Sequence, residues 1–182
     1  MTTRVWPLSM LSGAASEKPR EGKPEATGFL LIESDRRLAK RLQAALQAPC
    51  SHYEDGARAM AHLQGEGPYA DRKVHPLPQA ILVDLEHSRD SGLDFLQWTR
   101  GTPSLRLIPV IVFKHSFSAD DLQEAYSQGA VSCIEFPADD VAAARVAEGL
   151  KRYWLGLNLP PLVPPPSCAH RATGSERSLH GP

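Results

Sequence analysis

The chain has 182 residues, 42% of them hydrophobic, and its 20 Lys and Arg nearly balance its 21 Asp and Glu, for a formal net charge of -1. This length predicts one globular domain with room for tails but not for a second full domain. The near-zero charge provides no broad attraction to phosphate backbones or anionic lipid, so a nucleic-acid or membrane function is disfavoured.

Cysteine content and hydropathy add two exclusions. Cys50, Cys133 and Cys168 are widely separated, odd in number and without C-x-x-C spacing, so they indicate neither a disulfide framework nor a zinc site. Reduced thiols in a cytoplasmic protein are therefore expected. No apolar run approaches the roughly 20 residues that a membrane span needs.

The composition changes twice along the chain. Residues 1–27 carry much Pro, Gly, Ser, Lys and Glu, which predicts a disordered leader. Apolar runs then alternate with helical periods, which predicts a folded domain over 28–156. Residues 157–182 are rich in proline and predict a disordered tail.

The first predicted unit is a strand followed by a helix. The run Phe29–Ile32 is continuously apolar, as in a strand that is covered on both faces. It stops before Ser34 or Asp35, either of which can cap the helix that follows. One face of that helix is formed by Leu38, Leu42 and Leu46.

The second unit is shorter and ends in a long connection. A strand is expected over 51–53, then a turn at Asp55-Gly56, then a helix with Ala57, Met60 and Leu63 at helical spacing. Residues 64–78 form a polar connection that is long for a loop between a helix and a strand.

Three further units complete the domain. The run 80–83 predicts a strand that ends in Asp84, followed by a helix over 92–100 with Leu93 and Leu96 inward. Strands are also expected over 110–113 and 131–135. Their helices are one that carries Leu122, Ala125 and Tyr126 and is closed by Gly129, and one over 138–155 that carries Val146, Leu150, Tyr153 and Trp154.

This regular alternation predicts an α/β fold, a doubly wound, five-stranded parallel sheet of flavodoxin-like type. In such sheets functional residues gather beyond the carboxyl ends of the strands. Those ends carry Glu33 and Ser34, Asp84, Lys114 and His115, and Glu135 and Phe136.

The order of motifs resembles the receiver domain of bacterial two-component response regulators. The resemblance rests on "FLLIESD", "EDGARAM", "AILVDLEHSRDSGLDFL", "IPVIVF" and "QGAVSCIEFP", in that order and at compatible spacing. It implies a (βα)5 receiver fold, an aspartate that accepts a phosphoryl group, an acidic pair that holds Mg²⁺, and a Thr or Ser and a Lys that bind the phosphoryl oxygens. Asp84 matches the acceptor, Glu33 the first acidic position, and Gly92 the glycine that opens the following helix.

The sequence departs from the family pattern around that site. Ser34 stands at the second acidic position, and a neutral hydroxyl is a poor ligand for a hard cation. Lys114 replaces the Thr or Ser, and His115 replaces the small residue after it. Phe136 stands at the lysine position before Pro137, Cys133 at the switch position where the family often has an aromatic residue, and His87 and Ser88 replace Met-Pro.

Asp84 and the residues that depart from the family pattern each have a structural interpretation as well as a functional one. Asp84 is either the acceptor or a turn residue at a strand end. Lys114 is either a solvated lysine or an ion-pair partner of Asp84 that imitates the phosphorylated charge balance. His115 is either a surface residue or a lid over the acceptor. Phe136 is expected to pack in the space of the missing lysine, with a cis peptide before Pro137 as one option.

The leading hypothesis is a degenerate receiver, or pseudo-receiver, that is not an enzyme and acts by binding another signalling protein without phosphorylation of Asp84. It requires no cofactor and no metal. The alternative is a working single-domain regulator that is phosphorylated on Asp84 in a phosphorelay, with Mg²⁺ held by Glu33 and Asp84. A flavodoxin-like enzyme or nucleotide binder is the third class, but neither G-x-G-x-x-G nor a P-loop follows the first strand.

The expected partner surface comprises the last two helices and the fifth strand, which carry Tyr126, Tyr153 and Trp154. This surface suits an output protein or a second copy of the chain, although such aromatic residues often only cover the sheet. "PPLVPPP" at 160–166 favours polyproline II, which docks on aromatic grooves, or forms a solvated tail.

Overall fold

The computed structural model describes residues 28–86 and 89–159, so the predicted leader, most of the predicted tail, His87 and Ser88 lie outside the described residues. The strands are β1 (Phe29–Ile32), β2 (Cys50–Tyr53), β3 (Ala80–Asp84), β4 (Val110–Lys114) and β5 (Ser132–Glu135). The helices are α1 (Arg36–Leu46), α2 (Gly56–Gln64), α3 (Arg89–Gly101), α4 (Ala119–Ser127) and α5 (Asp140–Lys151). A short 3-10 helix, η2 (Gly67–Tyr69), follows α2, and a π-helical segment, η3 (Arg152–Leu157), continues α5.

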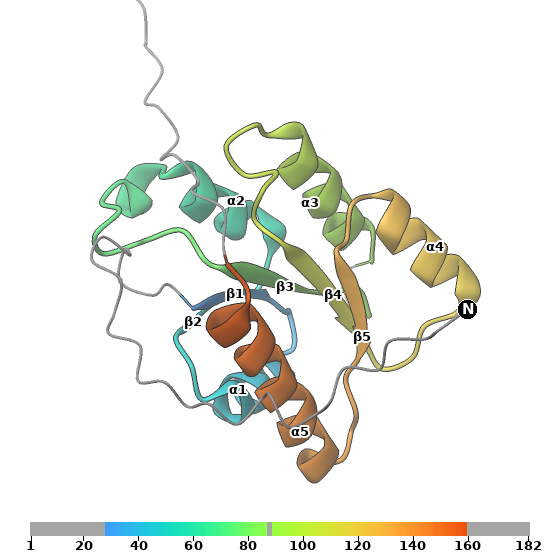
Figure 1. Cartoon of the computed structure of the whole chain (residues 1–182). Coiled ribbons are helices and arrows are strands. Elements are labelled where there is room, and N and C mark those ends of the chain that lie inside the picture. Colours follow the sequence, from blue (N-terminus) through green and yellow to red (C-terminus); the bar gives the residue numbers. More distant parts are fainter. Residues whose placement is uncertain (1–27, 87–88, 160–182) are drawn as a thin grey trace, which may run out of the picture.

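The five strands are parallel and lie in the order β2-β1-β3-β4-β5, which confirms the predicted doubly wound sheet (Figure 1). The strand order reverses at β1, which has β2 on one side and β3 on the other. Glu33 and Asp84 therefore stand at the switch point, where sheets of this type bind their ligands.

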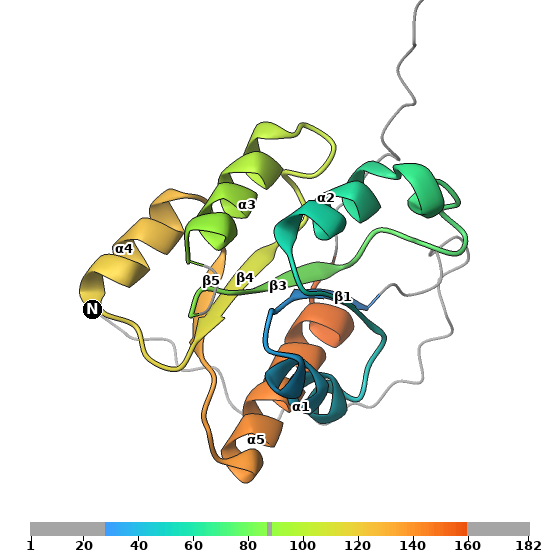
Figure 2. The ribbon, with the colours of Figure 1, turned by 180° about the vertical axis from the view of Figure 1, so that it is seen from behind.

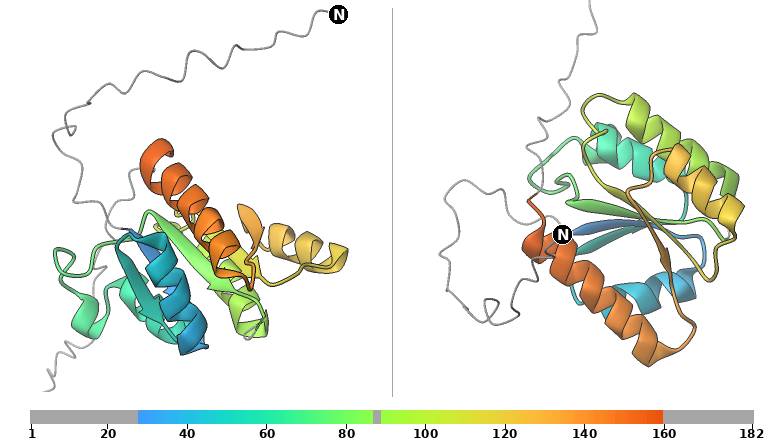
Figure 3. Two further views of the ribbon diagram at one scale, coloured as in Figure 1. Left: turned by 90° about the horizontal axis from the view of Figure 1, so that it is seen from below. Right: turned by 45° about the vertical axis from the view of Figure 1, so that its right-hand side comes forward.

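Helices cover both faces of the sheet. The views from in front and from behind show α2, α3 and α4 on one face and α1 and α5 on the other (Figures 1 and 2), and the turned views separate the same two layers (Figure 3). Among the described residues no helix is both long and apolar enough to cross a membrane.

Side chains of each strand alternate between these two layers, as the pleat requires. In β4, Val110 and Val112 pack with the α2–α3–α4 layer, whereas Ile111 and Phe113 pack with the α1–α5 layer. Both layers are closed cores, because the central strands β1 and β3 are buried along their whole length. That double burial explains why their sequences are continuously apolar.

Capping decides where α1 begins. The Asp35 carboxylate accepts hydrogen bonds from the backbone N–H groups of Arg37 (2.8 Å) and Leu38 (3.4 Å), so Asp35, not Ser34, is the N-cap residue. Ala39, Leu42 and Leu46 face the sheet and are buried.

Several element limits differ from those predicted. β4 extends to Lys114, β5 begins at Ser132, and α5 begins at Asp140. In α2 the buried positions are Ala59, His62 and Leu63, and the predicted Ala57 is exposed. In so short a helix, the spacing of alanine and leucine does not decide which face of α2 packs against the sheet. The contacts of the His62 ring fix that face.

His62 anchors the long connection between α2 and β3. The buried ring (3% exposed) accepts from the Tyr53 hydroxyl at Nδ1 (2.6 Å) and donates from Nε2 to the Pro76 carbonyl (3.1 Å). It also stacks on Tyr69, with ring centroids 5.3 Å apart. Burial, together with the neighbouring Arg72 and His75, holds the pKa of His62 below its ordinary value of 6.5.

The neutral His62 ring therefore stabilises the fold, and its contribution is complete above about pH 6.5 and is lost as the pH falls below that value. We expect the urea midpoint of unfolding to be lower at pH 5 than at pH 7.5, and we expect His62→Gln to reduce that difference. His115→Gln is the control, because this side chain is exposed and lies in the segment after β4. An unchanged pH dependence in His62→Gln would contradict the assignment.

Candidate functional site

Two buried carboxylates mark the switch point. Glu33 (1% exposed) follows β1, and Asp84 (2% exposed) ends β3. Ile32 is aligned with Val83 in the parallel pairing, so the next residues along the two strands, Glu33 and Asp84, emerge side by side. Asp84 therefore has the place that the receiver resemblance implies for the acceptor.

The second acidic position is not filled by a carboxylate. Ser34 occupies it and is exposed, and the neighbouring Asp35 is engaged as the α1 cap. The Asp35 backbone N–H also donates to Glu33 Oε1 (2.7 Å). Within the described ranges no group of three or more His, Cys, Asp or Glu side chains is arranged to hold a metal ion. Of the acidic pair and the acceptor that the family implies for a hard cation, the described residues supply Glu33 and Asp84, one carboxylate fewer.

Gly92 allows α3 to approach the end of β3. A Cβ atom at this position would lie 2.4 Å from Leu85 Cδ2 and 3.3 Å from the Asp84 carbonyl oxygen. The glycine that matched the family pattern thus allows the close contact between the helix and the strand that carries Asp84.

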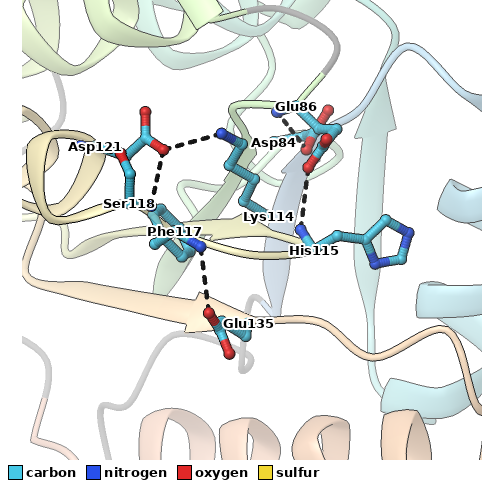
Figure 4. Close-up of polar contacts among 8 residues, drawn as sticks. All are labelled: Asp84, Glu86, Lys114, His115, Phe117, Ser118, Asp121 and Glu135. Atoms are coloured by element: carbon cyan, nitrogen blue, oxygen red, sulfur yellow. Dashed lines mark hydrogen bonds and ion pairs between the residues drawn. The ribbon is translucent and has the colours of Figure 1, made fainter.

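Lys114 pairs with Asp121 of α4, an arrangement that the sequence did not indicate. Its ammonium lies 3.0 Å from Asp121 Oδ2 (Figure 4). The strand register explains this orientation: Asp84 is aligned with Phe113, so Lys114 is one residue further along and points to the α2–α3–α4 layer. The expected ion pair with Asp84 is therefore not the one that the structure contains, and Lys114 is not a solvated side chain either, with 21% exposure.

Asp121 both pairs with Lys114 and caps the N-terminus of α4. Its Oδ2 also accepts the Ser118 backbone N–H (3.0 Å), and the Ser118 hydroxyl accepts the Asp121 backbone N–H, which completes a capping box for α4. The Ser118 contacts and the Lys114 ammonium lower the pKa of Asp121 to about 2.

His115 points away from the acceptor. Its side chain is exposed, its Nδ1 lies 2.8 Å from the Phe136 carbonyl oxygen, and Figure 4 shows the ring directed away from Asp84. The structure thus has the surface arrangement for His115 rather than the lid. Its backbone N–H donates to the Glu86 carboxylate (3.1 Å).

Phe136, at the lysine position, is part of the α1–α5 core. It is 2% exposed, meets Phe113 edge to face with centroids 6.2 Å apart, and lies under the Arg41 guanidinium at 5.6 Å. Arg41 also donates to the Pro137 carbonyl (3.0 Å) and pairs with Asp140. The peptide before Pro137 is trans, so the cis option is wrong.

Cys133 links β5 to α4. Its side chain is half-buried and packs with the α2–α3–α4 layer, and its backbone N–H donates to the Tyr126 hydroxyl (3.3 Å). Burial raises the pKa of the Cys133 thiol, so the thiol form dominates at neutral pH.

Sequence reasoning missed two carboxylates that organise this edge, Glu86 and Asp121. Glu135, which was predicted to lie at this edge, accepts the Phe117 backbone N–H at Oε1 (3.2 Å). Asp121 was detectable, because Ser118-x-x-Asp121 has the capping-box pattern. Glu86 has no sequence signal, since its contact with the His115 N–H depends on how the segments after β3 and β4 meet.

Proteins of similar sequence and structure include response regulators. The chain is 38% identical over 141 residues to the probable methanogenesis regulatory protein FilR2 of Methanothrix harundinacea, covering 73% of this chain and 86% of that protein. It is 29% identical over 133 residues to response regulator Rcp1 of Synechocystis, covering 70% and 88%. The crystal structure of the phosphorylated cyanobacterial phytochrome response regulator RcpA superposes with a TM-score of 0.68 at 27% identity, covering 75% and 99%. No protein-family model matches the chain.

The doubly wound parallel sheet, with a buried aspartate at its switch point, is thus the fold of a response regulator receiver. The chain belongs to the response regulator receiver family. The resemblance that the motifs indicated is thereby confirmed at the level of the family.

The Lys114–Asp121 ion pair predicts acid sensitivity of α4. The folded-state pKa of Asp121 is depressed to about 2 from 3.8, so its contribution is complete above about pH 3.8 and is lost as the pH falls through about 2. We expect Asp121→Asn to unfold at a lower temperature than the wild type at pH 6, and this deficit should shrink at pH 2 to 3. Asp120→Asn, the exposed neighbour, is the control.

Phe136 predicts a large structural cost of truncation. We expect Phe136→Ala to destabilise the fold by about 3 kcal/mol in urea unfolding, since the ring is buried against Phe113 and below Arg41. The control Tyr153→Ala removes a half-exposed ring and should cost less. Equal losses for the two variants would show that Phe136 is not part of the core.

Proposed function

We propose that this receiver acts as an atypical, phosphorylation-independent signalling protein that works by binding another protein. The family assignment makes it a response-regulator-like signalling protein. The finer proposal is that the protein signals without phosphorylation of Asp84. It rests on the locations of Lys114 and Phe136, which stand at the family's phosphoryl-binding positions.

Two observations carry the proposal. A buried phenyl ring stands where the family has a lysine, and the nearby Lys114 ammonium is paired with a carboxylate. Phe136 stands in place of the family lysine and is committed to the α1–α5 core. Lys114, the cation next along β4, is neutralised by Asp121 on the opposite layer. Phe136 therefore supplies no positive charge at the lysine position, and the charge of Lys114, at the position of the family hydroxyl, is paired with Asp121.

That exchange matters because phosphoryl transfer is almost entirely a problem of charge. A carboxylate attacks a dianionic phosphoryl group only when cations offset the accumulating negative charge. Removing one such electrostatic contact typically costs on the order of 100- to 1000-fold in rate. The missing lysine and the missing second carboxylate ligand would act together at one site.

A working phosphoacceptor remains the second candidate, and Asp84 and Gly92 favour it. Both residues have the family identity, and Gly92 permits the close packing of α3 against the end of β3. The structural relative RcpA is described as phosphorylated. In this alternative a histidine kinase phosphorylates Asp84, and the Lys114–Asp121 pair must open to release the cation.

The partner is proposed to be another cytoplasmic signalling protein that binds α4, β5 and α5. Tyr126, Val131 and Tyr153 are exposed on this side of the domain. Val131, Ile134 and Tyr153 also line a shallow groove between β5 and the end of α5. A second copy of the chain is an alternative occupant of the same side.

The deciding experiment is chemical modification of Asp84. We expect that incubation with Mg²⁺ and acetyl phosphate leaves the intact mass of the protein unchanged, because Phe136 stands at the lysine position and the Lys114 ammonium is paired with Asp121. Asp84→Ala is the control for any labelling that occurs elsewhere. Stoichiometric labelling of the wild type that disappears in Asp84→Ala would replace the proposal by the phosphoacceptor alternative.

A further inference from the structure

Glu86 connects the ends of two neighbouring strands. Its backbone N–H donates to Asp84 Oδ1 (2.9 Å), and its own Oε2 accepts the backbone N–H of His115 (3.1 Å). Figure 4 draws these two bonds, with the Lys114 side chain directed to Asp121. A single residue thus contacts the acceptor position and the end of β4.

The need for this contact follows from where the strand pairing stops. Asp84 is aligned with Phe113, and the last backbone bond between the two strands runs from the Leu85 N–H to the Phe113 carbonyl (3.2 Å). One residue further along, the His115 N–H donates to a side chain instead of a carbonyl of β3. The Glu86 carboxylate takes this donor, which would otherwise face the carboxyl edge of the sheet.

His115 extends the connection to β5. Its ring nitrogen Nδ1 bonds to the carbonyl of Phe136, the residue that follows β5. Hydrogen bonds therefore run from Asp84 through Glu86 and His115 to Phe136. They tie together the chain segments that leave β3, β4 and β5.

The charge of Glu86 gives this connection a further meaning. An anionic group carried by Asp84 would be stabilised by peptide N–H donors at the end of the neighbouring strand. At the end of β4 the His115 N–H is already bound by a full negative charge. A second anion at Asp84 would also face repulsion from the Glu86 carboxylate.

We propose that Glu86 is a resident anion that holds the segments after β3 and β4 in one fixed arrangement, by occupying the His115 N–H that an added anion on Asp84 would use. It is a positioning residue, since it acts through the backbone of His115. The proposal rests on the proposed function in one respect: a chain that signals without a phosphoryl group needs another means of fixing these loops.

The test measures backbone hydrogen exchange of the His115 amide in the full chain, followed by NMR without any phosphodonor. We expect Glu86→Ala to accelerate exchange of this amide about tenfold, because a hydrogen bond to a charged acceptor is lost. Glu86→Gln retains an acceptor oxygen but not the negative charge, and should restore part of the protection. Glu66→Ala, an exposed glutamate that caps η2 without a side-chain bond, is the matched control and should leave the His115 amide unchanged.

Unchanged exchange in Glu86→Ala, or equal acceleration in Glu86→Ala and Glu86→Gln, would overturn the proposal. Because Glu86 is exposed, its truncation leaves the core intact, and the amides of β3 provide an internal check on folding. The outcome is separate from that of acetyl phosphate labelling. Labelling of Asp84 refutes phosphorylation-independent signalling, whereas the exchange of the His115 amide alone decides the role of Glu86.

Discussion

The alternation of side chains at the carboxyl end of the sheet is the constraint on which this site depends. Asp84 and Phe113 are aligned, so the residue after Phe113 necessarily points to the other layer. Lys114 follows that rule and meets Asp121 of α4, while Phe136 joins Phe113 in the α1–α5 core. Strand register therefore decides that the Lys114 ammonium lies in the α2–α3–α4 layer, where it pairs with Asp121.

Packing and electrostatics reinforce each other around Phe136. A buried lysine at this position would require an anionic partner, whereas a phenyl ring needs only apolar neighbours and a surface to cover. Arg41 lies over the ring and also binds the carbonyl of Pro137 and the carboxylate of Asp140. The positive charge on this side thus stabilises the turn into α5.

The doubly wound parallel sheet and the position of Asp84 at a strand end could be predicted from the sequence. Both depend on continuous apolar runs and helical periods, which are local patterns. The Asp35 cap was one of two options, and only the backbone geometry chose between them. The partners of Lys114 and His115 were not predictable, because they depend on loops that converge from distant parts of the chain. The role of Glu86 could not be predicted for the same reason. A glutamate two residues after an aspartate is not a recognisable motif, and its contact with the His115 N–H depends on the fold.

The outermost strands of the sheet, β2 and β5, have only four residues each. Each has one edge of backbone donors and acceptors outside the ladder, but brevity limits how many bonds an added strand can form. Glu54 and Glu135 place a carboxylate just beyond one strand and at the end of the other. The fold thereby disfavours growth of the sheet from one molecule to the next, and helices and side chains are left to mediate contacts with other proteins.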